Sequence, residues 1–191
     1  LNIHILADYI YLDDTERKLF AEARHEYLIE QVQFNGIYNI HSTTNLIDLY
    51  FRNNVKDLYW FLDSDKNLYQ KDRNNYSLNN SVDSGNPITN TKILINNTKF
   101  VEYDGTYTNY IVPYENYKTT PSDGINVYKF GLDDGMMPTG SLNFSMLDRT
   151  QMEVKIDSNY LINANKKILV FGTSYNILRV MSGLAGLAFI E

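Results

Sequence analysis

The 191-residue sequence contains no cysteine. This absence excludes disulfide bonds, cysteine zinc sites and thiol catalysis, and it leaves the redox compartment of the protein open. No apolar run approaches the roughly 18 residues of a transmembrane helix. Lys and Arg number 17 against 23 Asp and Glu, a net charge of −6. A dedicated nucleic-acid or anionic-membrane surface is therefore not expected, because both need clustered cations.

Aromatic residues and asparagine are abundant, with 16 Tyr and 9 Phe against a single Trp. Aromatic residues suit half-buried sheet surfaces, and Asn suits turns, so the composition favours many short strands joined by Asn-rich loops. An AT-rich genome explains the Asn excess equally well. The length fits one domain plus at most an appendage.

The first part of the chain predicts a strand over residues 1–12 and a helix over 14–32. Asp13 and Glu16 are spaced as a helix-capping pair, and Gly36 is expected to end the element. Apolar residues recur at spacings of three and four, as on one face of a helix. These residues are Leu19, Phe20, Ala23, Tyr27 and Leu28.

The remainder predicts short strands. Residues 46–51 and 55–62 are expected to pair as a hairpin, as are 93–95 and 99–101 across Asn96-Asn97. Further strands are expected at 125–130, 141–145, 152–156, 167–171 and 175–180. The polar stretch 63–91 predicts a long exposed loop, and 103–124 a structured connection. One helix followed by about eight strands indicates a mainly β fold, a β-sandwich with a leading helix.

The last apolar stretch, Tyr175–Phe189, is expected to lie inside that sandwich. Its side chains Ile177, Leu178 and Val180 are expected to contribute to the core. Gly183 and Gly186 in the same stretch lack the lysine and the strand–loop–helix context of a phosphate loop. They indicate close backbone packing instead.

The search for chemistry yields no catalytic, cofactor-binding or metal-binding residue. His4, His25 and His41 lack the spacing of a cupin-type metal site, which predicts ordinary surface or interface histidines. The acidic clusters at 133–135 and 63–65 could offer oxygens to calcium, but turn chemistry explains both.

Four Asn-x-Ser/Thr sequons occur, at Asn75, Asn79, Asn96 and Asn143. Only Asn75 and Asn79 fall in the predicted exposed loop, which makes these two the candidates for glycosylation. A group of tyrosines could stack on sugars as in a lectin, although such a cluster more often belongs to a core or a subunit interface. The group comprises Tyr103, Tyr107, Tyr110, Tyr114 and Tyr117.

Four blocks of the sequence, in order along the chain, form a further pattern. The first, 9–33, contains Asp-x-x-Glu-Arg and then His-Glu-Tyr-Leu-Ile-Glu-Gln. The second, 106–128 with Gly105 before it, contains Gly-Thr-Tyr, Pro-Tyr and Gly-Ile-Asn-Val-Tyr. The third, 138–145, reads Pro-Thr-Gly-Ser-Leu-Asn-Phe-Ser, and the fourth is 175–189.

Together these blocks resemble the major capsid protein of nucleocytoplasmic large DNA viruses, the double jelly-roll family. The first resembles that family's link between its two jelly rolls, with the His-Glu-Tyr stretch on a helix. The third is similar to the family's Pro-Ser-Gly-x-x-Asn-Phe-Ser, and the fourth to its C-terminal strand. The sequence departs from the family at Met146-Leu147-Asp148, where Arg-Ile-Asp is usual, and at Met136-Met137.

The resemblance implies the C-terminal part of a longer capsid subunit. Residues 1–12 would be the last strand of the first jelly roll, 13–33 a connecting helix, and 34–191 the second jelly roll, with loop 63–91 exposed. It implies a structural protein without enzymatic activity or cofactor, placed in the outer capsid shell of a virion assembled in the infected host cell. Homotrimers would form pseudo-hexagonal capsomers that contact neighbouring capsomers and minor capsid proteins, without direct nucleic-acid contact.

Two rival functions are open. The first is a carbohydrate-binding β-sandwich module that uses the tyrosines around 103–117; the second is a sandwich hydrolase. A binding module should be monomeric and retain sugar, whereas a capsid subunit should trimerise and bind no small ligand.

Overall fold

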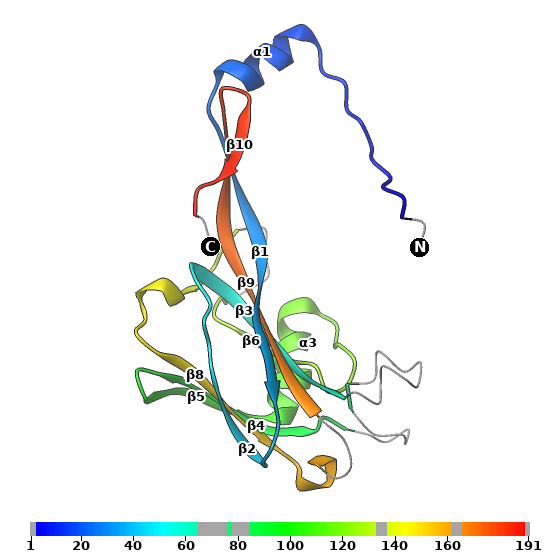
Figure 1. The fold of residues 1–191 in the computed structure, drawn as a ribbon, viewed down its shortest axis with the longest axis vertical. Helices are drawn as coiled ribbons and strands as arrows, with labels where there is room; N and C mark the ends of the chain where they lie inside the picture. Colours follow the sequence, from blue (N-terminus) through cyan, green and yellow to red (C-terminus); the bar gives the residue numbers. More distant parts are fainter. Residues whose placement is uncertain (1–2, 65–75, 78–84, 133–136, 162–165, 190–191) are drawn as a thin grey trace. The chain divides into compact units, whose positions relative to one another are not determined.

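The computed structural model describes residues 3–64, 76–77, 85–132, 137–161 and 166–189 (Figure 1). The chain forms two compact units. The sandwich unit comprises Glu30–Tyr175, and the ribbon unit comprises Leu1–Ile29 with Asn176–Glu191. The boundary between them falls inside two long strands, β1 (His25–Asn39) and β9 (Lys166–Met181).

The other elements are short. The strands are β2 (Thr44–Asp48), β3 (Asn54–Ser64), β4 (Ile88–Ile95), β5 (Thr98–Asp104), β6 (Asn126–Lys129), β7 (Leu142–Asn143), β8 (Thr150–Ile156) and β10 (Leu184–Leu187). The helical elements are α1 (Asp14–Glu22), η1 (Tyr107–Ile111), α3 (Val112–Tyr117), η2 (Phe144–Met146) and η3 (Ser158–Leu161).

Two sheets face each other in the sandwich unit. One has the strand order β1-β9-β3-β6, with β7 beside β3; the other has the order β2-β8-β4-β5. In the ribbon unit, β10 pairs with the end of β9. Successive strands therefore cross repeatedly from one sheet to the other, which is the topology of a jelly roll. The predicted fold class, a mainly β jelly-roll sandwich preceded by one helix, is confirmed.

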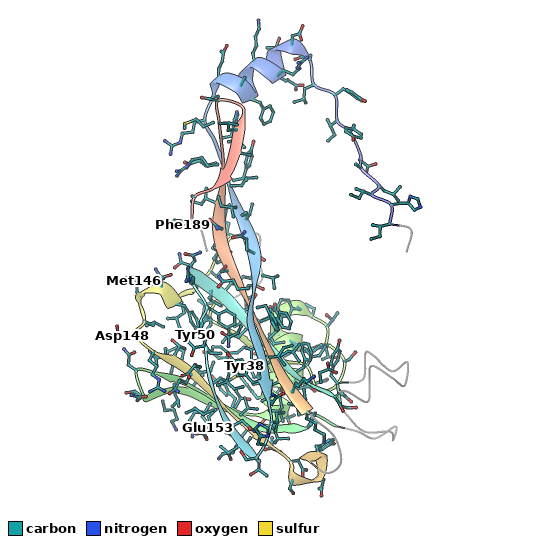
Figure 2. The ribbon with its side chains drawn as sticks, viewed as in Figure 1. Tyr38, Tyr50, Met146, Asp148, Glu153 and Phe189 are labelled. Atoms are coloured by element: carbon teal, nitrogen blue, oxygen red, sulfur yellow. The ribbon has the colours of Figure 1, made fainter. Side chains whose placement is uncertain are left out.

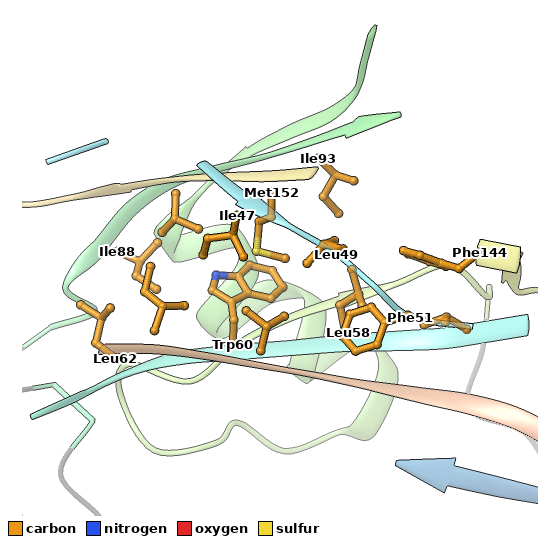
Figure 3. Packing of buried hydrophobic residues seen from close by; sticks show 14 of the residues in the cluster. Ile47, Leu49, Phe51, Leu58, Trp60, Leu62, Ile88, Ile93, Phe144 and Met152 are labelled. Carbon is orange, nitrogen blue, oxygen red and sulfur yellow. The ribbon is translucent and has the colours of Figure 1, made fainter. Parts of the chain in front are cut away.

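The core fills the space between the two sheets (Figure 3). Trp60, Leu58 and Leu62 project from β3, opposite Ile93 of β4 and Met152 of β8, and all are at most 1% exposed. Alternate residues of β3 face inward after a bulge between Val55 and Asp57. Because strand side chains alternate between faces, this period of two brings the apolar set to one side.

The predicted helix over 14–32 is wrong in its second half, as is the connecting helix over 13–33. The predicted capping pair is confirmed, since Asp13 Oδ1 accepts the Glu16 N–H at 2.8 Å. The helix ends at Glu22, and Ala23 is already extended. Residues 25–39 form β1 instead, with Gly36 inside the strand at a φ of 111°. The spacing that suggests a helix is overridden because β1 pairs with β9.

Two further strand predictions are corrected. Residues 46–51 and 55–62 do not form a hairpin, because β2 and β3 belong to opposite sheets. Residues 167–171 and 175–180 are one strand, β9, rather than two. By contrast, the predicted hairpin across Asn96-Asn97 is confirmed as β4 and β5, with both asparagines at positive φ.

Residues 3–12 form no strand in the structure, contrary to the sequence prediction. Their apolar side chains are exposed, with Ile5 at 90% and Leu6 at 97%. A strand exists only where a neighbour completes its hydrogen bonds, and no described residue pairs with this segment. Its assignment to a preceding jelly roll stays a prediction.

The predicted loop over 63–91 is shorter than expected, because β3 extends to Ser64 and β4 begins at Ile88. Tyr76 lies with its ring centroid 4.6 Å from that of Phe61, and Ser77 is buried. The other residues between Ser64 and Gly85 lie outside the described part of the chain. The predicted structured connection over 103–124 is confirmed, since it contains η1 and α3.

Truncating a buried side chain of β3 should test the placement of the core. Leu58→Ala is expected to lower the free energy of unfolding by about 2–5 kcal/mol, because the side chain is fully buried and leaves a cavity. Leu46→Ala on β2 is the control, since Leu46 is 56% exposed. Urea denaturation measures both. Similar losses for the two variants would show that the core lies elsewhere.

Candidate interaction surfaces

A buried hydrogen-bond network anchors the connection between β5 and β6. Asn126 Oδ1 accepts from Thr108 Oγ1 at 2.8 Å and from Asn86 Nδ2 at 2.6 Å. Its Nδ2 donates to the Gly124 carbonyl at 3.0 Å, and Asn86 Nδ2 also donates to the Gly105 carbonyl at 2.9 Å. Asn126 and Thr108 are at most 1% exposed. Since these buried polar groups satisfy one another, they hold η1 and α3 in one arrangement.

Two glycines of the same connection admit no side chain. A Cβ on Gly105 would lie 1.8 Å from the Ile88 carbonyl oxygen. A Cβ on Gly124, whose φ is 93°, would lie 2.3 Å from the Tyr76 carbonyl oxygen. The second sequence block, 106–128 with Gly105 before it, thus contains two glycines that this packing requires.

The tyrosines around 103–117 form separate pairs. Tyr103 stacks on Tyr107 at 4.4 Å between ring centroids, and the Tyr117 hydroxyl lies 2.9 Å from that of Tyr59. Burial raises the pKa of Tyr59 to about 12. Only Tyr110 and Tyr114 are more than half exposed, with parallel rings 6.2 Å apart. The five side chains therefore do not form one continuous platform for a sugar.

The third block, 138–145, packs against the start of β3. Phe144 is buried in the core, and its N–H donates to the Asn53 carbonyl at 3.0 Å. The Asn53 N–H in turn donates to Ser145 Oγ at 2.8 Å. Asn143 Oδ1 accepts the Ser145 N–H at 3.1 Å and so begins the short helix η2. These residues join the β2–β3 and β7–β8 connections.

A row of aromatic rings crosses the outer face of the six-stranded sheet. Phe34 of β1 stacks on Phe171 of β9 at 4.8 Å, Phe171 on Phe61 of β3 at 5.9 Å, and Phe61 contacts Tyr76. Phe34 is 51% exposed. Phe171, Phe61 and Tyr76 are half-buried, so the row is partly exposed. Partly exposed aromatic side chains of this kind are typical of protein contacts.

A cleft of about 400 Å³ lies between residues 48–52 and 144–150. Asp48 Oδ1 accepts a hydrogen bond from Gln151 Nε2 at 2.8 Å and forms an ion pair with Arg149 Nε at 3.5 Å. Asp148 also lines the cleft, and the adjacent Met146 is exposed (Figure 2). The lining of the cleft contains both acidic and basic side chains. This mixed charge suits polar contacts with another protein rather than one defined small ligand.

The structure locates the other predicted site residues. His4 and His41 are exposed, and the His25 ring lies at the start of β1 beside Phe20. Asp63 is the penultimate residue of β3, where its Oδ1 accepts the Ser64 N–H, and Asp65, Asp133 and Asp134 lie outside the described residues. The described residues contain no group of three or more His, Asp or Glu side chains able to hold a metal. None of the described helices has the length and apolarity to cross a membrane.

The predicted glycosylation sites Asn75 and Asn79 lie outside the described residues, so they stay a prediction. The amide oxygens of the other two sequon asparagines serve the fold. Asn96 Oδ1 accepts the Arg149 N–H at 3.1 Å, and Asn143 begins η2.

The sequence prediction misses the aromatic row, because it assigns the neighbourhood of Phe34 to the end of a helix. It also misses the Asn86–Asn126 network. The signal available for that network was the pair Gly105 and Gly124, whose carbonyls accept its hydrogen bonds.

Removing the central amide should loosen the whole connection. Asn126→Leu is expected to cost about 2–4 kcal/mol of unfolding free energy, since it leaves Asn86 and Thr108 with fewer partners in a buried site. Limited proteolysis should then cut within 105–124 faster than in the parent chain. Asn159→Leu, at an exposed position, is the control and should change neither measurement. An Asn126→Leu chain as stable as the parent would contradict the role of the network.

Comparison with known proteins places these surfaces in context. The model of a family described as large eukaryotic DNA virus major capsid protein matches residues 16–186. The chain is 29% identical to a major capsid protein of Pyramimonas orientalis virus, over 97% of this chain and 48% of that protein. It is 32% identical to probable capsid protein 4 of Acanthamoeba polyphaga mimivirus, over 99% of this chain and 39% of that protein. The chain thus spans about half or less of the length of these curated relatives.

The fold is similar to a chain in a quasi-atomic model of the PBCV-1 virus capsid. The TM-score is 0.76 and the sequence identity 25%, over 96% of this chain and 56% of that one.

Proposed function

Because the chain belongs to the major capsid protein family of large eukaryotic DNA viruses, we propose that it is part of a structural subunit of an icosahedral capsid. The observation that carries the proposal is the family match over 16–186 on a chain with jelly-roll topology. The subunit is a component of the outer shell of the virion rather than an enzyme.

In this proposal the sandwich unit is the second of two jelly rolls in the subunit. Support comes from the relatives, which are about twice as long or longer, and from the solved capsid chain, of which the match covers 56%. Three such subunits form a pseudo-hexagonal capsomer, and capsomers contact one another and minor capsid proteins. The partly exposed aromatic row and the mixed-charge cleft supply surfaces for these protein contacts.

Trimer formation is the property to test first. The complete subunit, consisting of these 191 residues with the rest of their natural polypeptide, should give the mass of a trimer in light scattering. The reason is that a stable capsomer contact buries more than about 1,000 Å², enough to hold subunits together at micromolar concentration. A stable monomer at high micromolar concentration would contradict the proposal.

The carbohydrate-binding alternative is tested on the same sample with a glycan array. The capsid proposal expects no sugar retention. Retention that is abolished by the double substitution Tyr110→Ala and Tyr114→Ala, the exposed stacked pair, would favour the alternative.

A further inference from the structure

The ribbon unit is built from the ends of three strands. The first residues of β1 neighbour the end of β9, and β10 turns back along β9 on its other side (Figure 1). Leu187 lies opposite Leu178, and Ala185 opposite Val180. Because directly opposed residues of a ladder point to the same face, these four side chains share one face of the ribbon.

The other face carries the charges. Arg179 Nε lies 2.8 Å from Glu26 Oε1, and Arg24 also reaches this carboxylate at 2.8 Å. The hydrogen bond from Arg179 is the main cause that lowers the pKa of Glu26 below its usual range. Met181 and Leu184, paired in the ladder, lie on this charged face with Arg179.

Alternation along β1 then assigns its remaining residues. Since Glu26 is on the charged face, Tyr27 and Ile29 lie on the opposite one. That face, here called the uncharged face, contains no Lys, Arg, Asp or Glu. It consists of His25, whose ring stacks on that of Tyr27, together with Tyr27, Ile29, Leu178, Val180, Ala185 and Leu187.

Within the ribbon unit, Phe20 of α1 packs on the His25 end of the uncharged face, with ring centroids 4.8 Å apart, and the rest of the face stays partly exposed. No apolar side chain among residues 3–29 and 176–189 is buried; Tyr27 is 45% exposed and Leu187 39%. Ile177, Leu178 and Val180 are only half-buried and belong to this unit, so the predicted placement of Tyr175–Phe189 inside the sandwich is wrong. A narrow ribbon without a core is marginally stable in water and needs a partner layer.

The chain path favours a partner in the same polypeptide. Residues 3–12 are exposed and apolar, and they lead directly into α1, which belongs to the ribbon unit. Polypeptide that precedes residue 1 would therefore be connected to the sandwich unit through this unit. The relatives are long enough to supply it, because this chain covers 48% and 39% of two of them.

We propose that the uncharged face of the ribbon is a docking surface for the preceding half of the same subunit. The inference rests on the proposed function, since it requires a two-part subunit. It assigns the C-terminal strands β9 and β10 a role in joining the two halves, in addition to the role of β9 in the sandwich.

Hydrogen–deuterium exchange tests the proposal without any substitution. Amides of residues 176–187 should exchange at least about tenfold more slowly in the complete subunit than in the 191-residue chain, because docking suppresses local opening of the ribbon. Equal rates in the two proteins would overturn the proposal. A second outcome would also overturn the proposal. If the slow exchange appears only at concentrations where light scattering shows a trimer, the surface contacts a neighbouring copy instead.

Two substitutions on β10 form a matched pair. Leu187→Lys places a charge on the uncharged face and should remove most of the added protection in the complete subunit. Leu184→Lys, on the charged face and 77% exposed, should leave it unchanged. Equal effects of both variants would contradict the assignment of the face.

Light scattering on the parent subunit separates the docking proposal from the proposed function. Protection of residues 176–187 without a trimer would contradict the proposed capsomer but support the docking surface.

Discussion

Strand β9 is the element on which both units depend, because β1, β3 and β10 all pair with it. Its first half contributes Ile168 and Val170 to the core, and it presents Phe171 to the aromatic row on the outer face. Packing over β9 is tight at Gly172, where a Cβ would lie 3.1 Å from the Phe51 ring. Its second half forms the centre of the ribbon unit. One continuous strand therefore contributes side chains to the buried core, to the partly exposed aromatic row and to the ribbon unit.

Amide side chains, rather than apolar ones, fasten β1 to the connection between β2 and β3. Gln33 Nε2 donates to the Arg52 carbonyl at 2.7 Å, and its Oε1 accepts the Arg52 N–H at 2.9 Å. Asn35 acts in the same way, since its Nδ2 donates to the Asp48 carbonyl and its Oδ1 accepts the Tyr50 N–H. Asp48 is paired with Gln151 in the β2–β8 ladder, whereas Tyr50 and Arg52 belong to none of the described strands, so the amides satisfy their backbone groups. Val32 and Phe34 alternate with Gln31, Gln33 and Asn35 as in a strand, but this alternation covers only five residues and follows the helix-like spacing of residues 19–28.

The sequence blocks shared with capsid proteins have a structural explanation in this chain. Gly105 and Gly124 permit close backbone contact, Asn126 unites the network behind η1, and Asn143 with Ser145 fastens the β7–β8 connection to Asn53. Each of these residues is used for packing or hydrogen bonding within the fold. Such a distribution agrees with the proposed shell subunit, whose task is to keep one shape and present surfaces to its neighbours.

Local patterns were sufficient where a feature depends on adjacent residues. The Asp13 cap, the Asn96-Asn97 turn and the overall β class all follow from residues close in sequence, because capping and turn chemistry act over a few positions. The family resemblance, likewise, needed only the order of short blocks. Tertiary structure alone decided that residues 25–39 form a strand and that β2 and β3 lie in different sheets. It also decided that Ile177 and Val180 lie outside the core of the sandwich unit. The physical reason is that strand pairing joins residues far apart in sequence, and the periodicity of one strand contains no information about its partner.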